Sequence, residues 1–101
     1  MPWKVITAPE AARALAAARV WLTQPGSGFR GRRRWEKLLN APGRLRAFPY
    51  SGERAEHPGH YVLVEPESGY RLIYTIDPDT RDSGTAGDIR IVAVFGPGQQ
   101  P

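Results

Sequence analysis

The sequence predicts an α+β fold, in which a two-helix hairpin packs on a small, mostly antiparallel twisted sheet in the order β-α-α-β-β-β. Apolar residues recur at helical spacing in the first half of the chain, and near residue 60 the pattern changes to the alternation typical of strands. A short polar turn at 66–69 separates two strand-like segments, which predicts an antiparallel pair. With 101 residues, the chain is expected to form one domain over 1–101.

The first half of the chain predicts one strand and two helices. The apolar segment WKVIT at 3–7 is a strand candidate. Thr7 can cap the helix that follows, which is expected to extend to about Gln24. The second helix is expected to begin at residue 27 or 28 and to end at Asn40, because Pro42 lacks a backbone N–H and should break it.

The second half predicts a loop at 50–59 and three strands, at 60–65, 70–77 and 88–95, with a polar loop at 78–87 between the last two. The last two strands are apolar on both faces, so we expect them to be inner strands of the sheet, covered on both sides. In the last strand, alternation groups Ile89, Ile91, Ala93 and Phe95 on one face, and Arg90, Val92 and Val94 on the other.

Basic residues are concentrated in the middle of the chain. The net charge is +4, and residues 30–54 contain eight Lys and Arg against two acidic residues. The eight are Arg30, Arg32, Arg33, Arg34, Lys37, Arg44, Arg46 and Arg54. Such a segment attracts polyanions or acidic proteins at long range. The alternative interpretation is a helix face that is simply solvated.

Composition excludes several classes of protein. There are no cysteines, which rules out a disulfide framework and thiolate metal sites. No apolar run approaches the roughly 20 residues that span a bilayer. We therefore expect a soluble, cytoplasmic protein that uses no metal and no cofactor and does not bind membranes.

Two arginines within predicted strands are candidate functional residues. Arg71 and Arg90 lie on neighbouring antiparallel strands, so their guanidinium groups can converge on one phosphate or carboxylate. The alternative is that each arginine pairs with a local acid, for which the candidates are Glu65, Glu67 and Asp88. The sequence leaves both possibilities open.

Two histidines in the segment HPGH are the candidates for proton transfer. His57 and His60 lie in a Pro-Gly turn, and imidazole exchanges protons near neutral pH. A metal site is not expected, because no cysteine or clear third ligand accompanies them. The alternative is that they are turn residues without a chemical role.

Taken in order, these segments resemble the RelE/ParE superfamily of toxins from bacterial type II toxin–antitoxin systems. The resemblance covers most of the chain, including the opening strand, the helical hairpin and the hydrophobic final strand. Its sequence features are the passage Leu45, Phe48, Pro49 and Gly52, and the strand signature Tyr70, Arg71 and Tyr74. The resemblance implies a toxin that a cognate antitoxin neutralises in a hetero-oligomeric complex.

The superfamily has two main branches of activity. RelE-like members cleave mRNA on the ribosome with basic residues of the sheet and a C-terminal Tyr, Arg or His, whereas ParE-like members inhibit DNA gyrase. The segment FGPGQQP after the last predicted strand contains none of those groups. The sequence therefore favours a ParE-like gyrase inhibitor that is not an enzyme, in which Arg71 and Tyr74 chiefly shape the sheet.

The residues expected to contact the target or the antitoxin are Arg30, Arg33, Arg34, Lys37, Arg54 and Phe95. The first alternative is a RelE-like ribosome-dependent mRNA endoribonuclease that uses Arg71, Arg90 and a histidine, of which His60 is the first candidate. The second alternative is a nucleic-acid-binding module without toxicity, supported by the arginine-rich segment.

Overall fold

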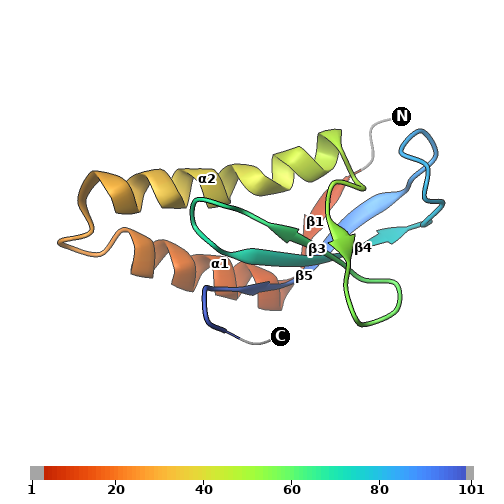
Figure 1. Cartoon of the computed structure of the whole chain (residues 1–101). Helices are drawn as coiled ribbons and strands as arrows, with labels where there is room; N and C mark the ends of the chain where they lie inside the picture. Colours follow the sequence, from red (N-terminus) through yellow and green to blue (C-terminus); the bar gives the residue numbers. More distant parts are fainter. Residues whose placement is uncertain (1–3, 100–101) are drawn as a thin grey trace.

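The computed structural model describes residues 4–99, which form an α+β fold of two helices and a five-stranded mixed sheet (Figure 1). The strands are β1 (Val5–Thr7), β2 (Glu53–Arg54), β3 (Tyr61–Val64), β4 (Arg71–Asp77) and β5 (Asp88–Phe95). Their order in the sheet is β1-β5-β4-β3-β2, with β1 parallel to β5 and the other neighbours antiparallel. The predicted α+β class is confirmed, and the sheet has one strand more than expected, the two-residue β2.

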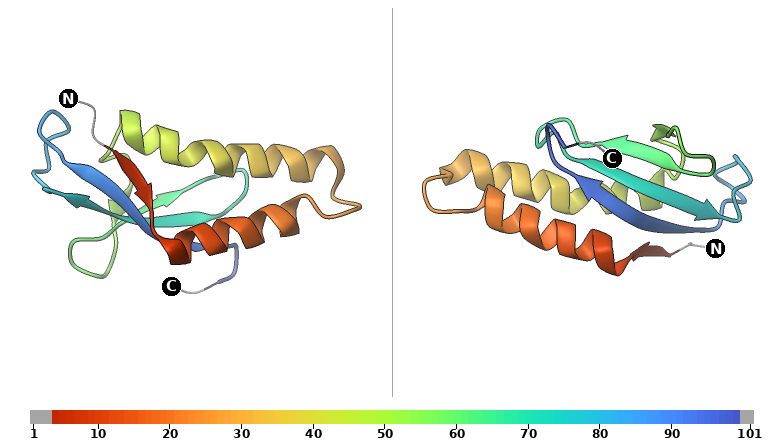
Figure 2. Two further views of the ribbon diagram at one scale, coloured as in Figure 1. Left: turned by 180° about the vertical axis from the view of Figure 1, so that it is seen from behind. Right: turned by 90° about the horizontal axis from the view of Figure 1, so that it is seen from below.

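Both helices lie against the same face of the sheet (Figure 2). They are α1 (Pro9–Leu22) and α2 (Gly28–Ala47), and their buried residues join those of the sheet in one core cluster. A close approach of the two helices explains Gly31, since a Cβ at this position would lie 2.1 Å from the backbone oxygen of Leu22. Gly31 thus allows the hairpin to close.

Helix α2 continues through Pro42, and the predicted end at Asn40 is wrong. The buried residues Leu38, Ala41 and Leu45 recur at helical spacing on both sides of the proline. All three are fully buried against the sheet, so tertiary packing outweighs the hydrogen bond that Pro42 removes. The final turn then ends at Ala47, where the backbone N–H of Phe48 donates to the carbonyl of Arg44.

Thr7 does not cap α1, contrary to expectation. It belongs to β1, and Ala8 occupies the N-cap position without a side-chain hydrogen bond. The Ala8 N–H donates to the carbonyl oxygen of Ile91 at 2.9 Å, so pairing with β5 continues up to the first turn of the helix. The strand ladder therefore sets the point at which α1 begins.

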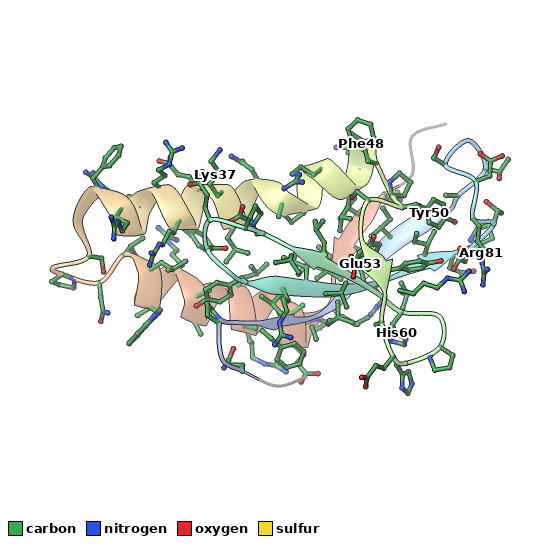
Figure 3. All side chains as sticks on the ribbon, in the orientation of Figure 1. Lys37, Phe48, Tyr50, Glu53, His60 and Arg81 are labelled. Atoms are coloured by element: carbon green, nitrogen blue, oxygen red, sulfur yellow. The ribbon has the colours of Figure 1, made fainter. Side chains whose placement is uncertain are left out.

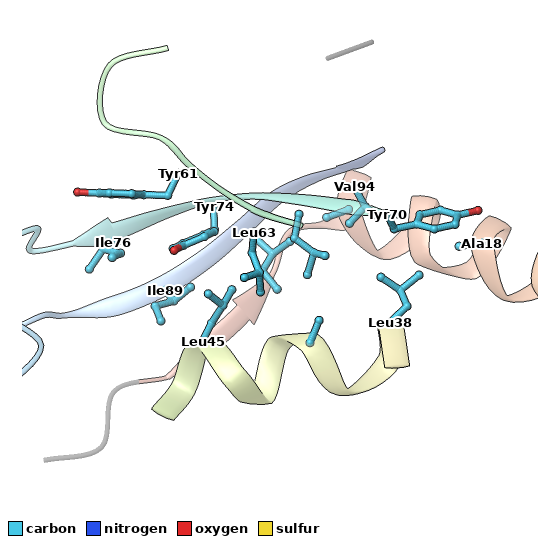
Figure 4. Close-up of a cluster of buried hydrophobic side chains, with 14 of the residues drawn as sticks. Ala18, Leu38, Leu45, Tyr61, Leu63, Tyr70, Tyr74, Ile76, Ile89 and Val94 are labelled. Atoms are coloured by element: carbon cyan, nitrogen blue, oxygen red, sulfur yellow. The ribbon is translucent and has the colours of Figure 1, made fainter. Parts of the chain in front are cut away.

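A single hydrophobic core fills the space between the helices and the sheet (Figure 4). Its largest completely buried hydrophobic side chains are Tyr74, Leu38, Leu45, Leu72, Ile89 and Ile91. Each aliphatic side chain of this size contributes roughly 1.5–3 kcal/mol when it leaves water. The core therefore fixes which face of β4 and β5 turns toward the helices and which face stays open.

A β-bulge changes the side-chain alternation within β5. Ile73 of β4 pairs with Ala93, but the next residue, Tyr74, pairs with Ile91, so Val92 is an extra residue. As a result, Val94 is buried in the core with Ile89 and Ile91. The predicted grouping of Ala93 and Phe95 with Ile89 and Ile91 is therefore wrong, because the bulge turns them to the opposite face.

Within residues 4–99, no second layer covers the face of the sheet opposite the helices. Strands β4 and β5 each have two neighbours, which confirms that they are inner strands. The expected cover on both sides is wrong, since both helices join the core on one side. The open face carries a partly apolar surface that includes Val62, Ile73 and Val92.

The hairpin of α1 and α2 extends beyond the sheet, and the described chain measures 44 × 27 × 23 Å along its principal axes (Figure 1). Neither α1 nor α2 combines the length and the apolar composition that a membrane crossing requires. The segment joining them, 23–27, lies at the end of the molecule opposite the loop between β4 and β5.

Candidate functional site

A shallow groove of about 780 Å³ crosses the open face of the sheet. Its floor consists of side chains from β3, β4 and β5, and its wall is formed by β2 and the loop that follows. The floor residues are Val62, Arg71, Ile73, Val92, Ala93 and Phe95, and the wall residues are Arg54, Ala55, Glu56, His57 and His60. Two arginines and two histidines therefore border one concave surface.

The loop at 55–60 brings both histidines to the groove. Its ends are joined by a hydrogen bond of 2.9 Å from the Ala55 N–H to the His60 carbonyl, and the His60 N–H donates to the His57 carbonyl at 3.1 Å. Gly59 has a φ of 81°, which glycine adopts without strain. The two imidazole rings meet edge to face with their centroids 4.9 Å apart. Figure 3 shows His60 at the end of the sheet away from the helical hairpin.

Arg71 is half-buried at the start of β4 and lines the groove. Its guanidinium Nη2 donates to the backbone carbonyl of Gln99, whose own N–H donates to the Gly96 carbonyl at 3.1 Å. The short turn after β5 is therefore held against β4 by Arg71. Within residues 4–99, Arg71 forms no ion pair.

The three acidic residues that were candidate partners for Arg71 and Arg90 form other contacts. Glu65 is buried and accepts the backbone N–H of Ser68 at 2.7 Å, which stabilises the turn between β3 and β4. Glu67 pairs with Arg33 of α2, and an Asp88 oxygen accepts the Lys4 N–H at 2.9 Å. Local pairing therefore does not explain Arg71.

Arg90 does not line the groove with Arg71. It is exposed and lies opposite Thr75, whereas Arg71 lies opposite Phe95. Positions 71 and 75 are four residues apart along β4, which separates them by about 13 Å at the usual rise per residue. The expected convergence of Arg71 and Arg90 on one site is wrong, and Arg54 is the second arginine of the groove instead.

The basic residues of α2 lie on the helical layer, apart from the groove. The Arg33 Nε is 2.9 Å from a Glu67 carboxylate oxygen, and the Lys37 Nζ is 4.0 Å from the other oxygen (Lys37 is labelled in Figure 3). The hydrogen bond from Arg33 lowers the pKa of Glu67. Arg30 and Arg34 are exposed and form no ion pair in the described part of the chain.

A cluster of Tyr50, Tyr61 and Asp79 lies beside the wall of the groove, since Tyr61 pairs with Arg54 of β2, and no local pattern in the sequence indicates this cluster. The Tyr50 hydroxyl donates to Asp79 Oδ1 and the Tyr61 hydroxyl to Asp79 Oδ2, each at 2.7 Å. Burial and the bond to Asp79 raise the pKa of Tyr61 to about 12, and the same two causes raise the pKa of Tyr50. Asp79, which lies in the predicted polar loop at 78–87, thus ties this loop to β3.

Tyr74, part of the strand signature, has a structural role in this fold. Its hydroxyl donates to the Pro49 carbonyl at 2.9 Å and accepts the Gly52 N–H at 3.1 Å. A Cβ on Gly52 would lie 2.6 Å from the Tyr74 oxygen and 2.5 Å from the carbonyl oxygen of Val62, so glycine is required there. This contact positions Gly52, the residue directly before β2, and therefore helps to place Arg54 within β2. Tyr70 is buried in the core.

The groove offers groups for binding and for proton transfer. The guanidinium groups of Arg54 and Arg71 suit the oxygens of a phosphate, and imidazole can accept or donate a proton near neutral pH. Among residues 4–99, no group of three or more His, Cys, Asp or Glu side chains is arranged to hold a metal ion. The chemistry available from these side chains is therefore anion binding combined with acid–base catalysis.

No protein-family model matches the chain, and no curated protein matches it.

Proposed function

We propose that the chain is a toxin of a type II toxin–antitoxin system, with the RelE/ParE fold, and that it cleaves mRNA in the manner of the RelE-like branch. The sequence features of the resemblance support the family. The observation that carries the choice of activity is the groove on the open face, whose lining includes two arginines and two histidines together with the acid Glu56.

Cleavage of RNA without a metal needs a base, an acid and a group that stabilises the charge on phosphorus. In the proposed reaction, one imidazole removes the proton of the ribose 2′-hydroxyl, whose oxygen attacks the adjacent phosphorus. The bond from phosphorus to the 5′-oxygen breaks, and the second imidazole donates a proton to that oxygen. Arg71 binds the phosphate oxygens throughout, and the products are a 2′,3′-cyclic phosphate and a free 5′-hydroxyl.

The sequence favoured the gyrase branch because the segment 96–101 contains no Tyr, Arg or His. The groove supports the ribonuclease because its histidines come from a different segment, the loop at 55–60, yet border the same surface as Arg71. This placement supplies groups of the kind whose absence after β5 argued against nuclease activity.

Inhibition of DNA gyrase is the second candidate, and a different surface favours it. Val20 and Trp21 of α1 and Phe29 of α2 are 71%, 64% and 73% exposed near the end of the helical hairpin. Exposed apolar side chains beside the basic residue Arg30 suit a protein target better than a nucleic acid. A gyrase inhibitor would use this surface and would not need the groove.

The two activities are distinguished with the purified protein. Messenger RNA on programmed ribosomes is analysed by primer extension, and gyrase by supercoiling of relaxed plasmid. We expect cuts in the mRNA, a loss of at least about 100-fold in cleavage rate for Arg71→Ala and for His60→Ala, and no change for Arg13→Ala on α1. Intact mRNA together with blocked supercoiling would establish the second candidate instead.

The proposed toxin acts in the cytoplasm, where its targets are found, and a cognate antitoxin neutralises it in a hetero-oligomer. Expression of the chain alone should stop growth, and coexpression with the product of an adjacent short gene should restore it. Normal growth of cells that accumulate folded protein would support the remaining alternative, a nucleic-acid-binding module without toxicity.

A further inference from the structure

A second recess, of about 250 Å³, adjoins the groove on the other side of the wall formed by β2 and its loop. Arg54 and His60 border both cavities, and the recess also includes Tyr61, Asp79 and Arg81. Arg81 comes from the loop between β4 and β5, which lies at the same end of the molecule as His60 (Figure 3). A ligand that extends from the groove past Arg54 would therefore reach Arg81.

The recess is basic although it contains a carboxylate. Both oxygens of Asp79 accept tyrosine hydroxyls at 2.7 Å, one from Tyr50 and one from Tyr61. Within the part of the chain that the structure describes, Arg54 and Arg81 form no ion pair. Two guanidinium groups therefore border a small cavity. Its one acidic lining residue, Asp79, already accepts two hydrogen bonds.

The backbone of Arg81 has an unusual conformation and is anchored by a hydrogen bond. Its φ of 63° lies in the left-handed region, which is uncommon for a residue with a side chain. Its N–H donates to the Tyr50 hydroxyl at 2.7 Å, and the loop closes through a bond of 2.9 Å from the Gly87 N–H to the Pro78 carbonyl. The position of this arginine is therefore fixed by the cluster that forms the recess.

We propose that Arg54 and Arg81 form a subsite for a further phosphate of the bound RNA strand, so that the protein holds the strand at a second place besides the scissile phosphate. This inference rests on the proposed ribonuclease activity, which places the scissile phosphate at Arg71. Guanidinium groups bind phosphate through paired hydrogen bonds, and a concave basic surface strengthens that attraction. The recess then governs how tightly a strand is bound, while the groove performs the reaction.

The test compares three variants in binding to a fluorescent 2′-O-methyl RNA octanucleotide, which lacks the attacking hydroxyl and is not cleaved. Arg81→Gly removes the guanidinium and suits a φ of 63°, so that the variant keeps its fold. Arg81→Lys retains the charge, and Arg13→Ala removes an exposed arginine from α1 as the matched control. Affinity is measured by anisotropy over a range of salt concentrations.

We expect Arg81→Gly to weaken binding about tenfold, as the loss of one charge-assisted hydrogen-bonded contact predicts. The slope of log K against log salt should fall in magnitude by about 0.7, the value for one phosphate contact to a single strand. Arg81→Lys should retain most of that slope, and Arg13→Ala should match the wild type.

Failure of this inference is distinguishable from failure of the proposed function. If Arg71→Ala abolishes cleavage but Arg81→Gly has wild-type affinity and salt slope, the subsite is overturned and the ribonuclease stands. If the wild-type protein does not bind the octanucleotide, the subsite is overturned, and the cleavage assay on programmed ribosomes decides the ribonuclease separately. Chemical shift changes at the Arg81 and Gly59 amides on titration with inorganic phosphate would support the subsite directly.

Discussion

Replacement of Tyr74 by phenylalanine tests how the fold positions the wall of the groove. The Tyr74 side chain is completely buried, and its hydroxyl bonds to the Pro49 carbonyl at 2.9 Å and to the Gly52 N–H at 3.1 Å. Tyr74→Phe removes one oxygen atom and keeps the ring. Both backbone groups then lose a partner, although the hydrophobic packing of the core is unchanged.

The expected decrease in the free energy of unfolding follows from the burial of the two backbone groups. Pro49 is buried, so its carbonyl loses a hydrogen bond that water cannot replace, whereas the partly exposed Gly52 can be hydrated. One unsatisfied buried group costs about 1–3 kcal/mol, and we expect Tyr74→Phe to lower the free energy of unfolding by about 2 kcal/mol. For a domain of this size, that corresponds to a decrease in Tm of roughly 8–16 °C.

The measurement is urea denaturation followed by tryptophan fluorescence, with thermal unfolding followed by circular dichroism. Tyr70→Phe is the matched control, because Tyr70 is also buried but its hydroxyl forms no hydrogen bond within residues 4–99. It should change the free energy of unfolding by less than about 0.5 kcal/mol. Equal effects of the two substitutions would refute the assignment of a structural role to the Tyr74 hydroxyl.

Three further predictions concern α2, the tyrosine cluster and the surface ion pair. Pro42→Ala should raise the free energy of unfolding by about 2 kcal/mol in urea denaturation, because it restores a hydrogen bond inside α2 and removes a steric clash. Asp79→Asn should lower the pKa of Tyr61 from about 12 in a titration of tyrosinate absorbance. Because burial and Asp79 favour the neutral phenol, the stability that Tyr61 contributes is complete below pH 10 and is lost as the pH rises toward 12. Since Arg33 lowers the pKa of Glu67, this pair stabilises the fold above the ordinary carboxyl pKa and ceases to do so as the pH falls through the lowered value. Arg33→Gln should therefore reduce the urea midpoint at pH 7 and leave it unchanged at pH 2.

Local patterns in the sequence predicted most of the elements. The apolar stripe of α1, the bounds 88–95 of β5 and the turn at 66–69 follow from periodicity and turn residues, which act over a few neighbours. The candidate residues Arg71 and His60 were also identifiable, since a charged residue in an apolar strand and a histidine pair stand out in a sequence. To predict that both residues line one groove, the register between the strands must be known, and no local pattern in the sequence specifies it.

The errors arose where tertiary contacts override a local rule. Pro42 should end a helix, but the buried stripe on either side of it keeps α2 intact. The extra residue Val92 reverses the alternation in β5, and nothing in DIRIVAVF marks a bulge. The hydrogen bonds of Asp79 could not be predicted, because its two tyrosine partners lie 29 and 18 residues away in the sequence.

The parallel pairing of β1 with β5 has a consequence for the order of assembly. Val5 pairs with Ile89, so the sheet becomes complete only when β5 enters between β1 and β4, a step that joins segments far apart in the sequence. Until then, β1 and β4 each present an unpaired edge that can associate with other chains. Because β5 also supplies Val92, Ala93 and Phe95 to the groove, the binding surface is complete only after β5 has joined the sheet. A partly folded molecule would therefore be prone to aggregate and would lack a complete groove.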